Sequence, residues 1–346
     1  MRDYIGLCDS SYFVDMQSVT GEIPFGGRSN QFLHNEGLAI ILYEFEASRY
    51  FKEGDLVKAS KFKNAANNAL SFLIYWLEKE PVSHIKNRYP IDSGYGCEFY
   101  AHFNKYMVTT ASWLYVAYVL CNDAIPVCDI KEEPLAFSLS KHFHKTFLKN
   151  NNYFVEIDDN ADSHYDTSGI GKIHLKGAPT PICLSVPGTA TPSYKIDGEN
   201  IIDFSIMPEI IENSLVFANR DNAKYNLKKL KNKNGIVSAL YDIKFKEETI
   251  NLYCEINKDC VNIKVDGKNE VLLMLPAFSF DGSSSTKIIN KNNIMEVYYE
   301  GYVCRYTSSS DIIPLNETSF NRNGRYDIFY TKGNKCLTVS VKIEHV

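Results

Sequence analysis

The sequence predicts a multidomain α+β protein, with a helical domain in residues 1–150 followed by an antiparallel β-sandwich in residues 151–346. Two observations predict this division. Apolar residues recur at helical spacing in the first third of the chain, whereas short runs of Val, Ile, Tyr and Phe, separated by Gly, Asn and Asp, fill the remainder. The 346 residues are enough for two domains of ordinary size.

Three strong helical patterns fill the first third, at Asn30–Phe51, Leu56–Glu80 and Glu98–Leu120. The last is the most apolar, so we expect it to be an inner, buried helix. A fourth, weaker helix is expected at Pro134–Leu148. Long helices joined by short turns are typical of an α/α toroid, which needs about twelve helices when complete. This chain is therefore expected to be a compact relative of that architecture or the C-terminal part of a larger one.

The pattern in the remaining two-thirds of the chain predicts strands. Asp266-Gly267 and Asp281-Gly282 are turn signals between them. The length and spacing of these strands predict a large antiparallel sandwich. The main runs are 153–157, 236–241, 249–256, 260–265, 271–275, 294–304 and 336–343.

Composition excludes several classes of protein. A net charge of −5 gives no electrostatic reason to expect binding to nucleic acid. No stretch approaches the ~20 apolar residues of a membrane span, so no membrane partner is expected. The nine cysteines are scattered and odd in number, which favours free thiols in a reducing compartment. The first residues lack the apolar core of a signal peptide, so we expect a cytoplasmic protein.

Three polar clusters lie where helices or strands are expected to begin. They occupy residues 26–36, 92–102 and 162–166. Packing does not require Arg, Asn, His, Tyr and carboxylates at such junctions, whereas a binding or catalytic site does. The candidate residues are Arg28, Asn30, Gln31 and His34 in the first cluster, Glu98, Tyr100 and His102 in the second, and His164 and Tyr165 in the third.

Helical spacing relates some of these residues. Asn30 and His34 are four residues apart and so share a helix face. Glu98, His102 and Tyr106 are spaced alike, whereas Tyr100 joins them only if the helix begins at or after it. The alternatives are that Asn30 is a helix N-cap with His34 an exposed polar residue, and that both tyrosines belong to the core.

The loop before the second cluster holds a further candidate, Arg88, whose planar guanidinium suits a carboxylate. The alternative is a surface loop held by an internal ion pair. No Cys-x-x-Cys or other ligand spacing indicates a metal, and no Gly-rich phosphate loop occurs. We therefore expect neither a metal nor a cofactor.

The second cluster, Asp92-x-Gly94-Tyr95-x-x-Glu98-x-Tyr100-x-His102, resembles the segment that bears a catalytic tyrosine in heparinase II/III-type polysaccharide lyases. The run from His164 to Gly171 is similar to the strand-turn-strand that brings a histidine to their cleft. The resemblance implies a toroid plus a sandwich, and cleavage of a uronate by β-elimination. It implies the following roles: Asn30 and Arg28 neutralise the carboxylate, Tyr100 is base or acid, His102, His34 and His164 are catalytic partners, and Gln31, Arg88, Glu98 and Tyr165 bind substrate.

Two alternatives stay open. A glycoside hydrolase on a related toroid would use paired carboxylates drawn from Glu98, Asp92 and Glu36. A non-catalytic sugar-binding subunit would bind ligand without turnover. The expected partner is an acidic oligosaccharide or polysaccharide, together with a second copy of the chain or another chain that completes the toroid.

Overall fold

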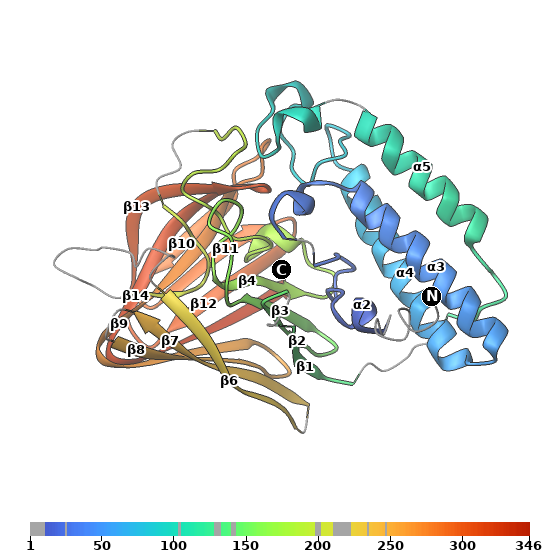
Figure 1. The fold of residues 1–346 in the computed structure, drawn as a ribbon. Coiled ribbons are helices and arrows are strands. Elements are labelled where there is room, and N and C mark those ends of the chain that lie inside the picture. The colour runs from blue at the N-terminus through green and yellow to red at the C-terminus, as the bar shows by residue number, and fades with distance from the viewer. Residues whose placement is uncertain are drawn as a thin grey trace.

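The computed structural model describes residues 11–24, 26–102, 105–127, 133–139, 143–197, 202–209, 223–233, 235–245 and 248–346. Helices lie on one side of the molecule and large antiparallel sheets on the other, which confirms a mixed α+β protein (Figure 1). Within the described ranges, no helix is long and apolar enough to cross a membrane.

Among the residues that the structure describes, the helical part holds one short and three long α-helices: α2 (Ser11–Asp15), α3 (His34–Glu53), α4 (Leu56–Leu77) and α5 (Lys105–Leu120). Gly54, at a φ of 84°, ends α3, and the side chain of Asp55 caps α4 by accepting a hydrogen bond from Lys58 N–H at 3.0 Å. Three predicted helices are thus confirmed, whereas a closed toroid is not seen among the described residues. The short 3₁₀ segments are η1 (Gly27–Gln31), η2 (Ile91–Ser93), η3 (Phe99–His102) and η4 (Thr180–Ile182).

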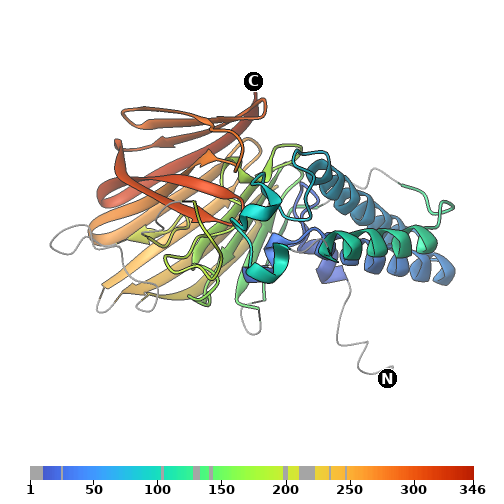
Figure 2. The same ribbon diagram turned by 90° about the horizontal axis from the view of Figure 1, so that it is seen from above.

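The position of α5 differs from the predicted inner helix. Within α5 only Thr110 and Ala117 are buried, while Tyr115 and Tyr118 are 69% and 77% exposed. The helix packs beside α3 and lies at the outer edge of the helical layer (Figures 1 and 2). An apolar composition predicts burial only where a further element covers the helix, and none of the described elements covers this face.

Four antiparallel strands form the smaller sheet in the order β1 (Leu135–Ser138), β2 (Lys145–Lys149), β3 (Tyr153–Asp158) and β4 (Gly169–Leu175). The predicted helix at Pro134–Leu148 is therefore wrong. Phe137 and Phe147 pair across β1 and β2 with ring centroids 5.2 Å apart, so cross-strand packing overrides a weak helical pattern. The smaller sheet begins before residue 150, and the division into two domains at that position stays a prediction.

In the described part of the chain, ten strands form the larger antiparallel sheet. Strand β9 runs through the predicted turn at Asp266-Gly267, and the predicted run 294–304 divides at Glu300-Gly301, where both residues have positive φ. The strands are β5 (Pro208–Glu209), β6 (Ala223–Lys233), β7 (Ile236–Phe245), β8 (Glu248–Ile256), β9 (Val261–Phe280), β10 (Lys287–Lys291), β11 (Ile294–Tyr299), β12 (Tyr302–Ser308), β13 (Ile312–Asn321) and β14 (Gly324–His345).

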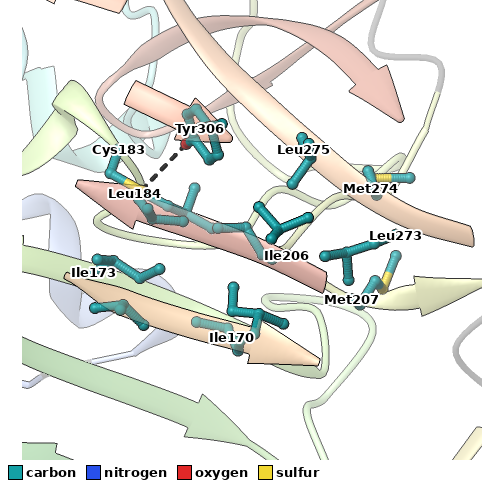
Figure 3. Packing of buried hydrophobic residues seen from close by; sticks show 14 of the residues in the cluster. Ile170, Ile173, Cys183, Leu184, Ile206, Met207, Leu273, Met274, Leu275 and Tyr306 are labelled. Carbon is teal, nitrogen blue, oxygen red and sulfur yellow. Dashed lines mark hydrogen bonds between the residues drawn. The ribbon is translucent and has the colours of Figure 1, made fainter. Parts of the chain in front are cut away.

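The main hydrophobic core lies between the two sheets. Ile170 and Ile173 of β4 join Leu273 and Leu275 of β9 in one buried cluster (Figure 3). The connection after β4 fills the space between them, where the Cys183 thiol lies 3.2 Å from the Tyr306 hydroxyl. The sheets therefore form a sandwich whose inner faces share side chains. The helices α3 and α4 pack around a separate hydrophobic core.

Candidate functional site

Segments distant in sequence meet between the helices and the larger sheet. An isolated antiparallel bridge joins Phe32, after η1, to Ile85 in the loop before η2. The same loop contacts the turn between β13 and β14, because the Asn87 amide donates to the Arg322 carbonyl at 2.9 Å and the Asn323 amide donates to the Lys86 carbonyl at 2.7 Å. These bonds hold the first two polar clusters against the sandwich.

The Arg322 side chain is the centre of this meeting point. Its Nη1 donates to Gln31 Oε1 at 2.7 Å, and its Nη2 pairs with Glu98 Oε1 at 3.1 Å. All three side chains are buried. The Glu98 carboxylate also accepts from the Ser193 hydroxyl at 2.7 Å, so its charge is compensated by an ion pair and a second donor.

Gln31 connects this ion pair to Tyr100. Its Oε1 accepts from Arg322 and also from the Glu98 backbone N–H at 3.0 Å. Two donors fix the orientation of the amide, so Nε2 faces the Tyr100 hydroxyl, 3.4 Å away. Tyr100 lies in η3, before α5 begins, and is half-buried beside the 78%-exposed Phe99. The phenol is thus half-buried, and the Gln31 amide behind it is itself bonded to Arg322.

An aromatic and histidine cluster adjoins Tyr100. The His34 ring stacks on Tyr106, with centroids 5.3 Å apart, and both lie against Phe32. Burial, with a smaller contribution from His84, lowers the pKa of His34, so this imidazole is neutral at pH 7. Its buried Nδ1 has no hydrogen-bond partner among the described residues. His84 is held differently, with Nε2 2.6 Å from the Ala101 carbonyl oxygen.

A buried charge network lies behind the same segments. Lys86 Nζ contacts Glu36 Oε1 at 2.7 Å and Glu22 Oε1 at 3.2 Å, and His174 Nε2 of β4 lies 3.6 Å from Glu22 Oε2. Burial raises the pKa of Glu36 to about 7 against the opposing effect of Lys86, and burial lowers the pKa of His174 to about 3. The network joins α3 to the smaller sheet without reaching solvent.

The structure brings together Gln31, Glu98 and Tyr100, and the rings of Phe32 and Tyr106 lie between Tyr100 and His34. Asn30 is buried beside them in η1, whereas α3 begins at His34 with Leu33 as its N-cap. The predicted shared helix face of Asn30 and His34 is therefore wrong, and so is the alternative that Asn30 is a helix N-cap. Arg88 pairs instead with Asp281, at 3.0 Å, which lies 193 positions away and so is not the internal ion pair of the alternative for its loop. The side chains of Arg28 and His102 lie outside the described residues.

The third polar cluster meets the first through Asp166. Its Oδ2 accepts from the Gly27 N–H at 3.1 Å, and the Tyr165 side chain lies against Gly27. Burial raises the pKa of Asp166 to about 6. His164 is exposed, with its ring edge-on to Tyr165 at 4.4 Å. Its predicted catalytic role stays untested.

Arg322, Ser193 and Tyr194 also belong to this site, but they were not among the residues predicted from the sequence. The Arg322 Cζ lies 4.4 Å from the centroid of the Tyr194 ring, and burial raises the pKa of Tyr194 to about 12 although Arg322 lowers it. The available signal was a cation inside Asn321-Arg322-Asn323-Gly324, a turn between two strand patterns. No group of three or more His, Cys, Asp or Glu in the described ranges could hold a metal ion.

Comparison with known proteins gives a weak resemblance at the level of the fold. No family model and no curated protein matches the sequence. Among solved structures, a heparinase III aligns with 97% of this chain at 10% identity and a TM-score of 0.41, and a chondroitin lyase that is a baculovirus envelope protein aligns with 84% at 10% identity and 0.28. The chain covers 54% of that heparinase and 59% of that chondroitin lyase.

Proposed function

We propose that this protein is a carbohydrate-active enzyme that cleaves a uronate-containing polysaccharide or oligosaccharide by β-elimination. The observation that carries the proposal is the chain of contacts from Arg322 through the Gln31 amide to the Tyr100 hydroxyl, beside the neutral His34. A heparinase II/III-like identity, a partial α/α toroid and a cytoplasmic location are finer parts of the same proposal.

The reaction needs a base, an acid and an anion-stabilising group. A base removes the proton from C5 of the uronate, the electron pair forms the C4=C5 double bond, and the C4–O bond breaks. An acid then protonates the departing oxygen. Negative charge that builds on the carboxylate during proton removal must be stabilised by fixed donors.

Tyr100 is the proposed base. Its oxygen faces the Gln31 Nε2 donor, and the cation of Arg322 lies directly behind that amide. This polarity stabilises the negative charge of a deprotonated phenol. Once Tyr100 has taken the C5 proton, its hydroxyl is also the proposed acid for the departing oxygen. His34 is the proposed catalytic partner as a proton acceptor, because its imidazole is neutral and its Nδ1 atom is not engaged by the described residues. Asn30 and Arg28 remain the proposed carboxylate neutralisers.

The carboxylates are less suited to a hydrolase. Glu36 is fully buried against Lys86, and Glu98 is buried against Arg322, so neither faces an open surface as a member of an acid–base pair. Asp92 is exposed in η2. These contacts favour elimination over hydrolysis in this site.

Product chemistry tests the proposal. The protein is mixed with oligomers of alginate, heparan, chondroitin, hyaluronan and pectin, and the products are followed by ultraviolet absorbance and mass. Elimination gives an absorbing C4=C5 enoate and a product set with no added water. Saturated reducing sugars that have gained water would replace the proposal with hydrolysis, and binding without turnover would replace it with a sugar-binding subunit.

A further inference from the structure

The outer side of α5 is an apolar surface without a cover among the described elements. We define the α5 face as Val108, Tyr115, Val116, Tyr118 and Val119, all of which are exposed. They recur along the helix at spacings of three, four and seven, and α5 carries a single charged residue, Lys105. A contiguous face of this kind marks an interaction surface.

We propose that the α5 face binds the α5 face of a second copy of this protein, with the two helices antiparallel about a two-fold axis. A two-fold interface must be self-complementary, since each residue meets its symmetry partner's counterpart. With the axis between Trp113 and Leu114, Val108 lies opposite Val119, and the small Ser112 lies opposite the large Tyr115. Ala111 and Val116 form the matching small–large pair.

Charge complementarity favours the antiparallel direction. Lys105 begins α5, and Asp123 follows its C-terminal end; both are exposed. Antiparallel pairing brings each Lys105 within reach of Asp123 of the other copy, at both ends of the interface. Parallel pairing would place two lysines together and two aspartates together, which is repulsive. Antiparallel helices also oppose their dipoles.

The surface is large enough for such a dimer. At the stated exposures the rings of Tyr115 and Tyr118 present on the order of 300 Å². Phe45 of α3 extends the apolar surface, because it lines one shallow groove together with Val119; the other side of that groove is polar and carries Arg49, Lys52 and Glu53. Together these residues approach the ~800 Å² that each partner contributes to a standard interface.

The oligomeric state of the full chain tests this inference. Sedimentation equilibrium over a wide concentration range should give twice the monomer mass of 39.4 kDa. Tyr118→Glu should weaken dimerisation at least tenfold, because the variant places two carboxylates in an apolar interface. The matched control is Ile236→Glu, at an exposed apolar position of β7, which should leave the dimer unchanged. Circular dichroism confirms that each variant is folded.

A charge exchange tests the direction of pairing. Lys105→Glu and Asp123→Lys should each weaken the dimer, and the double variant should restore it because the opposite charges meet again. A monomeric wild type would overturn the proposal and leave the face to a different partner. A dimer that survives Tyr118→Glu would also overturn it, since the interface would then lie elsewhere. Failure of the double variant to recover would contradict the antiparallel arrangement.

Discussion

The side-chain oxygen of Gln31 accepts a hydrogen bond from Arg322 Nη1 at 2.7 Å, although 291 positions separate the two residues in the sequence. The bond joins the 3₁₀ segment before α3 to the turn between β13 and β14. It also fixes the Gln31 amide, whose nitrogen then faces Tyr100. One contact therefore connects the sandwich, the helical layer and the candidate catalytic phenol.

Removal of the Arg322 side chain should strongly destabilise the fold. Arg322→Ala leaves the Glu98 carboxylate buried without its cation, and such a loss costs about 3–5 kcal/mol. The measurement is urea unfolding. Arg305→Ala is the matched control, because Arg305 forms comparable contacts with Glu296 and Glu344 at a more exposed position and should cost about 1 kcal/mol or less. Equal losses in the two variants would contradict a buried role for Arg322.

Gln31→Glu should separate the two functions of that side chain. The glutamate keeps an oxygen for Arg322 but replaces the N–H that faces Tyr100. If the proposed function holds, kcat should fall about 10²–10³-fold, the usual effect of losing one preorganised donor. Steady-state kinetics, with the mid-point of thermal unfolding as a control for folding, measure this. An unchanged kcat would remove Gln31 from the mechanism.

The sequence alone predicted part of this site. Gln31 and His34, and likewise Glu98 and Tyr100, were recognisable because each pair belongs to a local polar cluster before a helical pattern. Their approach to Arg322 was not predictable, since it depends on how the β13–β14 turn reaches the helical layer. Arg88 shows the converse, because a cation in a promising loop found its partner in Asp281.

The same limit applies to the fold. The helices α3 and α4 and most strands follow from local periodicity. The helix predicted at Pro134–Leu148 failed because Phe137 and Phe147 gain more from cross-strand packing than the segment gains as an isolated helix. Burial of α5 could not be predicted from its composition, because exposure depends on which elements surround it.

The stability of Glu36→Gln relative to wild type should depend on pH. Folding raises the pKa of Glu36 from 4.5 to about 7. Protonation of Glu36 therefore contributes fully to the stability of the folded wild type below pH 4.5, and this contribution is lost as the pH rises to about 7. The variant has no such titration. Its stability relative to wild type should therefore rise by about 1.4 kcal/mol per pH unit across this window and then level off. Parallel stability curves from urea unfolding at several pH values would contradict the assignment.

Gly96→Ala should disturb the turn between β13 and β14, which holds Arg322. A Cβ on Gly96 would lie 2.8 Å from the Arg322 carbonyl oxygen and 2.6 Å from Asn87 Nδ2, in addition to the strain of a φ of 71°. Gly235→Ala is the control for strain alone, because Gly235 has a φ of 78° and open space around it. We expect Gly235→Ala to lower the free energy of unfolding by about 1–2 kcal/mol, and Gly96→Ala to lower it by about 1–3 kcal/mol more. Urea unfolding measures both changes. Equal costs would mean that the turn adapts.

In the proposed elimination, the phenolate oxygen of Tyr100 takes the C5 proton of the uronate. The most direct measurement is the rate of enoate absorbance for wild type, Tyr100→Phe and Tyr106→Phe on the substrate that the wild type cleaves. Each variant loses one hydroxyl and keeps its ring, so the aromatic cluster is preserved. We expect Tyr100→Phe to lose turnover and Tyr106→Phe to keep it. Undiminished enoate formation by Tyr100→Phe would rule out Tyr100 as the base.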